Sequence, residues 1–186
     1  ALWGFAPTVT ADAVKPVEQA VLSNVARGVG HIVFAVRKLG MDGHWYANFG
    51  YYAEGPQRVT YADGTKLLKY NPASGECIAL VEDAGGGVRD PQVSYDGKTI
   101  LFSYRKGGSC NYNLYEIGVD GSGLRQVTDG PFDDIEPTYL PDGGIMFVSS
   151  RCKRWVNCWL TQVAVLYRCD ADGKNIRQVS GNIEHD

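Results

Sequence analysis

The stretch "DPQVSYDGKTILFSYR" at 90–105 decides the fold, because it recurs as "EPTYLPDGGIMFVSSR" at 136–151. The two copies lie 46 residues apart, both from Asp90 to Glu136 and from Arg105 to Arg151. Each is followed by a second matching segment, "NLYEIGVDGSGLRQVTDG" at 113–130 and "VLYRCDADGKNIRQVSGN" at 165–182. A looser copy precedes them, as "IVFAVR" at 32–37 and "LLKYNPASGECIALVED" at 67–83. Self-similarity at a fixed period predicts a repeat architecture.

Each complete repeat contains four short runs rich in Val, Ile, Tyr and Phe, the residues that favour strands. Asp-Gly pairs between runs are typical of tight hairpin turns. The predicted strands are 91–95, 100–104, 113–118 and 124–128 in the middle repeat, and 137–140, 145–149, 164–169 and 176–180 in the third. A four-stranded antiparallel unit of this length is the signature of a β-propeller blade. An ordinary β-sandwich is the alternative, but it does not explain the matching turns.

The predicted fold class is therefore all-β, a partial β-propeller of about two and a half to three blades. The blades cover about 30–83, 90–130 and 136–182, and the first lacks an obvious innermost strand. Residues 1–29 are predicted to form a partly helical lead-in, because "VEQAVLSNVARGV" has helix-like spacing. A closed ring usually needs four to eight blades. We therefore expect the 186 residues to be an N-terminal piece of a longer protein, with 30–186 as an incomplete propeller.

The overall composition excludes several classes of partner. Net charge is −3 and the chain contains no long block of Lys and Arg, which argues against nucleic acids and anionic membrane surfaces. No apolar run approaches the ~20 residues that cross a bilayer, so no membrane span is predicted. The hydrophobic share of 44% is enough to build an ordinary core.

The ends of the repeated strands carry the charged residues that single out one face of the predicted ring. In a blade, the hairpin turns lie on one face and the longer connections on the other, which we call the loop face. The candidates for its rim and for ligand contacts are Asp90, Glu136, Glu184, His185, Arg37, Arg105 and Arg151. The favoured interpretation is that acid–Arg pairs fix the orientation of the blades. The alternative is a channel that binds a cation or a cationic group. A metal stays an open possibility, and no catalytic residue is predicted.

The five cysteines include no Cys-x-x-Cys pair and no Cys-x-x-Cys-His, so no cofactor, and in particular no c-type haem, is expected to attach to this chain. Cys152 and Cys158 flank five residues and are candidates for a small disulfide-closed loop in an oxidising compartment. Free thiols, metal ligation and pairing with Cys110 remain open alternatives. Cys77 and Cys169 fall on predicted strands and are expected to be buried.

The blade pattern resembles the TolB-type, WD40-like propeller repeat, closely over 90–180 and loosely over 32–83. The stretches "VRDPQVSYDGKTILFSYRKGG", "DGPFDDIEPTYLPDGGIMFVSSRCKRWVNCW" and the final "NIEHD" look like the N-terminal propeller of large planctomycete proteins related to the hydrazine synthase alpha subunit. This resemblance implies a propeller joined to c-type haem domains that lie downstream, in a complex with other subunits. It also implies export to the periplasm or an equivalent compartment, which favours the Cys152–Cys158 disulfide.

The expected function is thus a scaffold or interaction domain for a following domain or for other subunits. The chain is not expected to be catalytic on its own, although a full-length relative could be an oxidoreductase. Two alternatives remain: the substrate-gating propeller of a prolyl-oligopeptidase-like hydrolase, and a TolB-like protein-interaction module of the cell envelope. The chain has no "GxSxG" motif that would place a hydrolase nucleophile in it.

Overall fold

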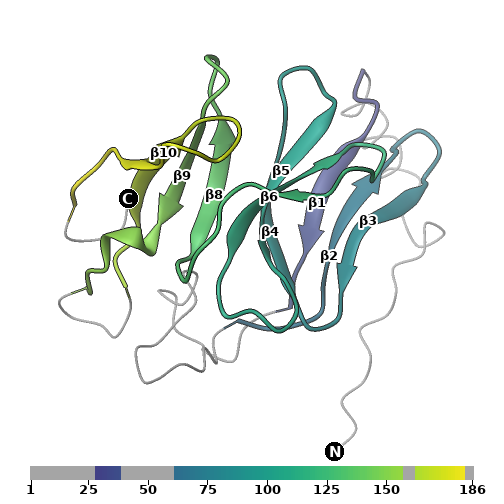
Figure 1. The fold of residues 1–186 in the computed structure, drawn as a ribbon. Helices are drawn as coiled ribbons and strands as arrows, with labels where there is room; N and C mark the ends of the chain where they lie inside the picture. The colour runs from purple at the N-terminus through teal and green to yellow at the C-terminus, as the bar shows by residue number, and fades with distance from the viewer. Residues whose placement is uncertain (1–27, 39–60, 157–161, 183–186) are drawn as a thin grey trace, which may run out of the picture.

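The computed structural model describes residues 28–38, 61–156 and 162–182, and within them the chain forms three antiparallel sheets (Figure 1). The first sheet has the order β1-β2-β3, the second β4-β5-β6-β7, and the third β11-β10-β9-β8. The strands are β1 (Ile32–Val36), β2 (Thr65–Tyr70) and β3 (Cys77–Asp83); β4 (Gly87–Val93), β5 (Thr99–Arg105), β6 (Asn113–Gly118) and β7 (Arg125–Gln126); and β8 (Asp134–Tyr139), β9 (Ile145–Ser149), β10 (Val165–Cys169) and β11 (Arg177–Gln178). A short 3-10 helix, η3 (Ser150–Cys152), follows β9.

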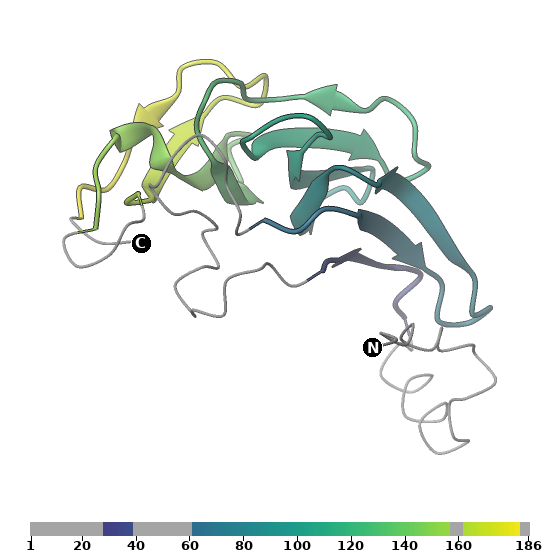
Figure 2. The same ribbon diagram turned by 90° about the horizontal axis from the view of Figure 1, so that it is seen from below.

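The three sheets follow one another side by side in an arc, as blades of an open propeller do (Figure 2). The all-β class and the propeller architecture predicted from the repeats are confirmed. The first blade has three described strands, and none of the described strands takes the innermost position that β4 and β8 occupy in the other blades. The predicted lead-in helix falls almost wholly within 1–27, outside the described residues.

The core lies between the blades, because alternate residues of each strand point to opposite neighbours. One cluster joins the first and second blades through Leu67, Val81, Ile100 and Phe102. The second joins the middle and third blades, and its members include Leu101, Leu114, Val127, Phe147 and Tyr167. Each blade therefore buries apolar surface mainly against its neighbours, as expected for a repeat protein.

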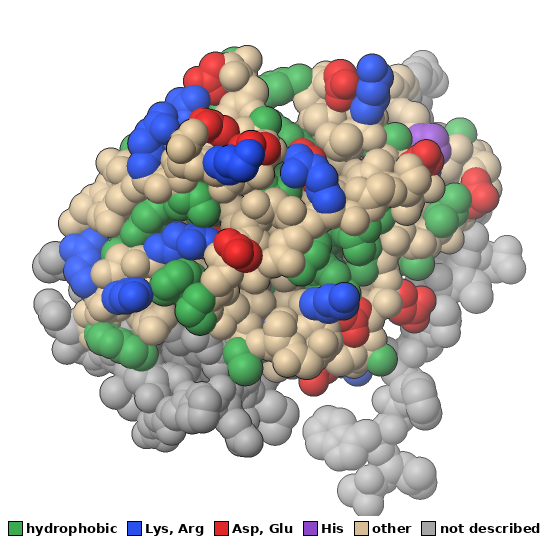
Figure 3. Space-filling view, in the orientation of Figure 1, with side chains coloured by type: hydrophobic (Ala, Val, Ile, Leu, Met, Phe, Trp, Pro, Cys, Tyr) green, Lys and Arg blue, Asp and Glu red, His purple; other side chains and the backbone are tan. Residues whose placement is uncertain are grey.

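Hydrogen bonds near the hairpin turns also join neighbouring blades. The Lys69 ammonium of the first blade donates to the Val119 carbonyl of the second, with 2.6 Å between the two atoms. The Tyr95 hydroxyl donates to the Tyr139 carbonyl of the third blade at 3.2 Å. The turns and the longer connections lie at opposite ends of the blades (Figure 1). Lys, Arg, Asp and Glu side chains are interspersed around the turn end (Figure 3).

The register corrects the predicted alignment of the third blade by one residue. In the middle blade, Phe102 of β5 lies opposite Tyr115. In the third blade, Tyr167 corresponds to Tyr115, and Phe147 lies opposite it, so Phe147 takes the position of Phe102. The β8–β9 hairpin is closed by Leu140 and Gly144, one residue tighter than the hairpin that Ser94 and Thr99 close. As a result, Arg105 ends β5, whereas Arg151 lies beyond β9 in η3. The prediction that Arg105 and Arg151 both end the second strand of a blade was therefore wrong for Arg151.

Candidate functional site

Asp90 and Glu136 lie inside the innermost strands and not before them, which corrects the predicted starts at 91 and 137. Strand β4 begins at Gly87 and β8 at Asp134. Both acids have positive φ angles, 55° and 52°, and each marks a β-bulge at which the pairing register shifts. A proline follows each acid and cannot donate to the ladder. The bulge turns these two acidic residues away from the regular pleat.

Arg89 links the two acids, although the sequence analysis did not single it out. Its Nε lies 2.5 Å from Asp90 Oδ2, and its terminal NH2 lies 3.2 Å from Glu136 Oε1. The Glu136 backbone N–H donates to the Asp90 carboxylate at 3.2 Å, so the middle and third blades are tied at their inner strands. Arg89 is almost fully buried. Burial alone lowers its pKa, but the Asp90 and Glu136 charges and the hydrogen bond to Asp90 contribute to a net rise.

Arg105 pairs with a different acid, one supplied by the first blade. Its terminal nitrogen lies 2.5 Å from Asp63 Oδ1, and it also donates to the Ala62 carbonyl at 3.3 Å. The guanidinium lies over the rings of Tyr61 and Tyr112, 5.6 and 5.9 Å from their centroids. Arg105 therefore holds the first two blades together through its charge pair with Asp63 and the Tyr61 ring, and it also packs on Tyr112 of its own blade.

Arg151 forms a charge pair within its own blade. Its Nε and terminal NH2 donate to the two carboxylate oxygens of Asp134 at 3.0 and 2.7 Å. Asp134 is fully buried and also accepts a hydrogen bond from the Ser149 hydroxyl at 2.6 Å. The Arg151 guanidinium lies 5.1 Å from the centroid of the Phe132 ring. This bidentate pair joins η3 to the start of β8.

Tyr112 lies where the charged residues of the first two blades meet. The Tyr112 ring meets the Tyr61 ring edge-on, with 4.7 Å between their centroids. The Arg89 guanidinium lies 6.0 Å from the centroid of the Tyr112 ring. Burial raises the pKa of its hydroxyl, and the positive charges of Arg105, Arg89 and Arg37 partly oppose that rise. Arg37 is exposed just beyond β1. We call Arg89, Arg105, Tyr61 and Tyr112, with the carboxylates of Asp63, Asp90 and Glu136, the arginine–tyrosine cluster.

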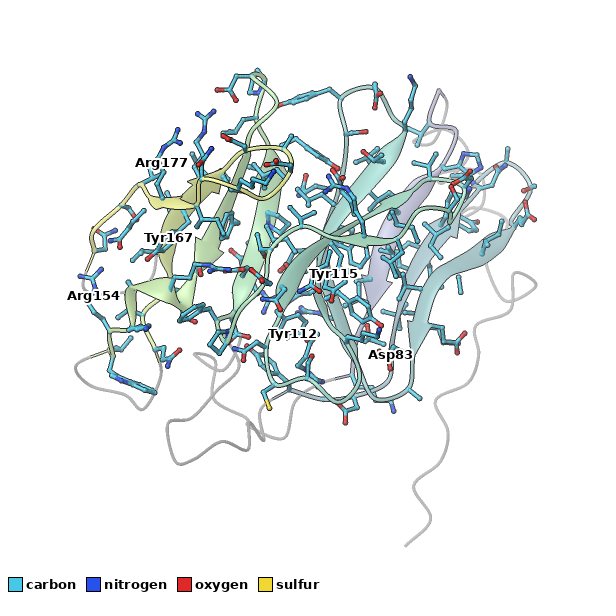
Figure 4. The ribbon with its side chains drawn as sticks, in the orientation of Figure 1. Asp83, Tyr112, Tyr115, Arg154, Tyr167 and Arg177 are labelled. Carbon is cyan, nitrogen blue, oxygen red and sulfur yellow. The ribbon has the colours of Figure 1, made fainter. Side chains whose placement is uncertain are left out.

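Two aspartates fix the backbone around this cluster. The Asp133 carboxylate accepts the Tyr112 backbone N–H at 2.9 Å and so connects the third blade to the second. Asp83, at the end of β3, accepts hydrogen bonds from the Tyr104 hydroxyl at 2.7 Å and from the Gly107 N–H at 2.8 Å. These bonds lower the pKa of Asp83. Tyr112 and Asp83 lie toward the same end of the blades, which is the loop face (Figure 4).

The remaining predicted residues lie partly outside the described chain. Glu184, His185 and Cys158 fall outside it, so their roles stay predictions. Cys152 is partly buried, and its sulfur lies 3.2 Å from the Val163 carbonyl oxygen. Cys169 is buried as expected, whereas Cys77 is exposed at the start of β3, which corrects that expectation. Within the described ranges, no group of three or more His, Cys, Asp or Glu residues could hold a metal ion.

Sequence reasoning missed Arg89, Asp63, Asp83, Asp133 and Asp134. One signal was available for Arg89, since it directly precedes Asp90, which was already a candidate residue. Asp134 gave no such signal, because the middle blade has Val88 where the third has Asp134. The partners of the missed aspartates come from other strands or other blades, so their roles depend on contacts that the repeat pattern does not contain.

Comparisons with known proteins agree with this architecture. No protein-family model matches the chain. It is 33% identical over 120 residues to the hydrazine synthase subunit alpha of Kuenenia stuttgartiensis, a match that covers 63% of this chain and 13% of that protein. The solved Kuenenia stuttgartiensis hydrazine synthase superimposes with a TM-score of 0.64 at 18% identity, over 97% of this chain and 29% of that one. A putative TolB from Agrobacterium tumefaciens gives a TM-score of 0.50 at 24% identity, over 61% of this chain and 40% of that one.

The chain thus spans only a small part of the curated protein that it matches. No helix in the described ranges is long and apolar enough to cross a membrane. The repeat pattern, the three-sheet arc and these similarities agree: the described strands form an open TolB-like β-propeller that is related to the alpha subunit of hydrazine synthase.

Proposed function

We propose that this chain is the N-terminal propeller part of a larger protein related to the hydrazine synthase alpha subunit, and that its loop face is a scaffold for a following domain or a partner subunit. The sequence similarity to that subunit is the observation that carries the proposal. The propeller positions other parts of the protein and performs no reaction by itself. Any oxidoreductase activity belongs to the larger protein.

The arginine–tyrosine cluster supports a docking role for the loop face. Arg89 and Arg105 are held by charge pairs to residues of neighbouring blades, so the face is rigid before any partner arrives. Preorganised side chains lose little freedom on binding. The carboxylates of Asp63 and Glu136 remain about half exposed and can accept donors from a partner.

The cofactor and the location follow from the same relationship. A c-type haem would be attached by segments outside these 186 residues, since covalent attachment needs a Cys-x-x-Cys-His motif that this sequence does not contain. Residues of the loop face would then support the domain that carries the haem. We place the protein outside the cytoplasm, where Cys152 and Cys158 would form their disulfide.

Cross-linking of the full-length protein tests the docking role. Lys106 and Lys153 are exposed at the loop face, and Lys98 and Lys174 are exposed in hairpin turns at the other end, which makes them matched controls. An amine-reactive cross-linker followed by peptide mass spectrometry should join Lys106 or Lys153 to the following domain or a partner subunit. Cross-links that form only from Lys98 and Lys174 would place the partner on the wrong face and refute the proposal.

Absorbance in the Soret region of the purified full-length protein separates the proposed relationship from the hydrolase alternative. We expect a Soret band that persists after denaturation, because c-type haem is bound covalently. A protein without that band that is labelled by a fluorophosphonate probe for serine hydrolases would favour the substrate-gating alternative.

A further inference from the structure

The connection between β9 and β10 of the third blade carries cations and aromatic rings that the repeat does not require. In the middle blade, the same connection begins with Lys106 and two glycines. In the third blade it forms η3 and continues as "KRWV" at 153–156. The middle blade folds without such side chains, so the propeller scaffold alone does not explain them.

The backbone holds this segment in one geometry. The Lys153 N–H donates to the Ser150 carbonyl at 3.1 Å and closes η3, and Lys153 then adopts a positive φ of 54°. A β-bridge pairs Trp155 with Gln162. Val156 is buried in the core between the middle and third blades. Because neighbouring residues of an extended chain point to opposite sides, Trp155 points outward and is 45% exposed.

The Phe132 ring lies beside two of the cations. The Arg151 guanidinium lies 5.1 Å from the centroid of this ring, and the Lys153 ammonium lies 5.5 Å from it. Aromatic faces attract cations, so the ring holds the lysine side chain near the exposed indole segment. The charge of Arg151 is balanced by the buried Asp134.

Two cations of this segment lack an acidic partner within the described residues. The ion pairs that Lys and Arg side chains of the third blade form there are Arg151–Asp134, Arg168–Asp142 and Lys174–Asp172. Lys153 and Arg154 take part in none of them. One terminal nitrogen of Arg154 donates to the Gly181 carbonyl at 3.3 Å, and the other is buried with no hydrogen-bond partner in the described ranges. Carboxylates of a partner would supply the missing acceptors.

These side chains lie together at the loop face. We call Phe132, Lys153, Arg154 and Trp155 the basic–aromatic patch. Figure 3 shows blue and green side chains side by side at the lower left, over the third blade. Figure 4 places Arg154 below Tyr167 and away from Arg177, which is toward the loop face. The patch is therefore part of the surface to which the docking role was assigned.

We propose that the basic–aromatic patch binds an acidic protein segment of the following domain or of a partner subunit. Asp or Glu side chains of that segment meet Lys153 and Arg154, and an apolar side chain covers Trp155. This partner chemistry rests on the proposed docking role of the loop face. Charge complementarity carries it, since two cations without acids lie beside an exposed indole. A protein segment is favoured over nucleic acid or an anionic membrane, because the chain has a net charge of −3, which repels a polyanion at long range.

Photo-cross-linking of the full-length protein, purified with its subunits, tests the proposal. Benzoylphenylalanine replaces Trp155, and peptide mass spectrometry identifies the cross-linked segment. We expect a peptide from outside residues 1–186 in which Asp and Glu are clustered. Raising NaCl from about 0.1 to about 1 M should reduce the yield about threefold or more, since the Debye length falls from about 10 to about 3 Å.

Charge variants in the same cross-linking background separate charge pairing from apolar contact. Lys153→Glu should lower the NaCl concentration that halves the yield by about twofold or more, and Lys153→Gln should have an intermediate effect. Lys98→Glu, in a hairpin turn at the other end of the blades, is the control and should leave that concentration unchanged. Replacing an acid of the cross-linked peptide by Lys should restore the yield in the Lys153→Glu protein. A misfolded patch would not give this rescue.

The outcomes distinguish this inference from the proposed function. A cross-link to a segment without acids, or to another part of residues 1–186, overturns the inference. A yield that neither salt nor Lys153→Glu changes also overturns it. Binding to phosphatidylglycerol vesicles that Lys153→Glu abolishes would assign the patch to a membrane surface and overturn it. If position 155 gives no cross-link while Lys106 still joins the following domain or a partner subunit, only this inference fails. If neither position gives a cross-link, the proposed function fails as well.

Discussion

Replacing Asp134 by alanine should destabilise the third blade far more than the loss of one surface charge. Asp134 is fully buried, and both of its carboxylate oxygens accept hydrogen bonds from Arg151, at 3.0 and 2.7 Å. The Ser149 hydroxyl donates to the same carboxylate at 2.6 Å. Asp134→Ala would leave the mostly buried Arg151 guanidinium and a buried hydroxyl without their acceptor. Removing one partner of a buried pair costs about 3–5 kcal/mol.

That cost corresponds to a melting temperature lowered by about 6–20 °C, since each kcal/mol shifts the midpoint by about 2–4 °C in a chain of this size. Thermal unfolding of the full-length protein measures the shift, and hydrogen exchange of the β8 and β9 peptides locates it. Asp134→Asn keeps an oxygen acceptor for Arg151 or Ser149 and should have an intermediate effect. The matched control is Asp142→Ala, because the Asp142–Arg168 pair is formed by an exposed carboxylate in a hairpin turn. Such pairs contribute little to stability.

The reasoning would be refuted if Asp134→Ala and Asp142→Ala lowered the melting temperature equally. Faster hydrogen exchange confined to segments outside the third blade would also refute it. Either result would mean that the buried pair does not join η3 to β8 in solution.

Three further predictions concern a carboxylate, a turn and a thiol. Asp83 has a pKa below its ordinary 3.8, first because the Tyr104 hydroxyl donates to it. The stabilising contribution of the Asp83 carboxylate is therefore present above pH 3.8 and is lost as the pH falls through the lowered pKa. Asp83→Asn should flatten this acid limb of a stability–pH curve. Gly173→Ala should lower the melting temperature more than Gly143→Ala. Both glycines have φ near 85°, but only a side chain at 173 would collide with a carbonyl of the neighbouring blade. An equal fall in melting temperature for the two variants would contradict that contact. Burial raises the pKa of the Cys169 thiol to about 11, so iodoacetamide at pH 8 should leave it unmodified in the native protein while it alkylates the exposed cysteines, as peptide mass spectrometry would detect.

The arginines show how far repeat matching extends. The matching "ILFSYR" and "IMFVSSR" predicted equivalent positions for Arg105 and Arg151, yet their partners are Asp63 of the preceding blade and Asp134 of the same blade. The cause is one residue fewer in the β8–β9 hairpin. The shorter hairpin leaves Arg151 beyond the end of β9, in η3, where its guanidinium meets Asp134 of its own blade. Hairpin length is a local property that the aligned Asp-Gly pairs did not reveal.

The acids show a similar limit. Their spacing correctly placed Asp90 and Glu136 at equivalent positions of two blades, although both acids lie within the inner strands and not before them. Their partner is Arg89, which links them across the boundary between the blades. The bulge that brings this about depends on a positive φ angle at a non-glycine residue, a conformation that local sequence preference disfavours. The surrounding hydrogen bonds, including that from the Glu136 N–H to Asp90, hold it in place.

The sequence by itself determined the blade type and the number of strands in each described blade. It could do so because strand alternation and hairpin turns are encoded by residues close together in the chain. Only the tertiary structure decided which charged groups pair and which apolar faces are covered, since those partners come from different blades. Ile32 and Ile100 occupy the same position in the repeat, and one is exposed while the other is buried because only the second has a described blade in front of it.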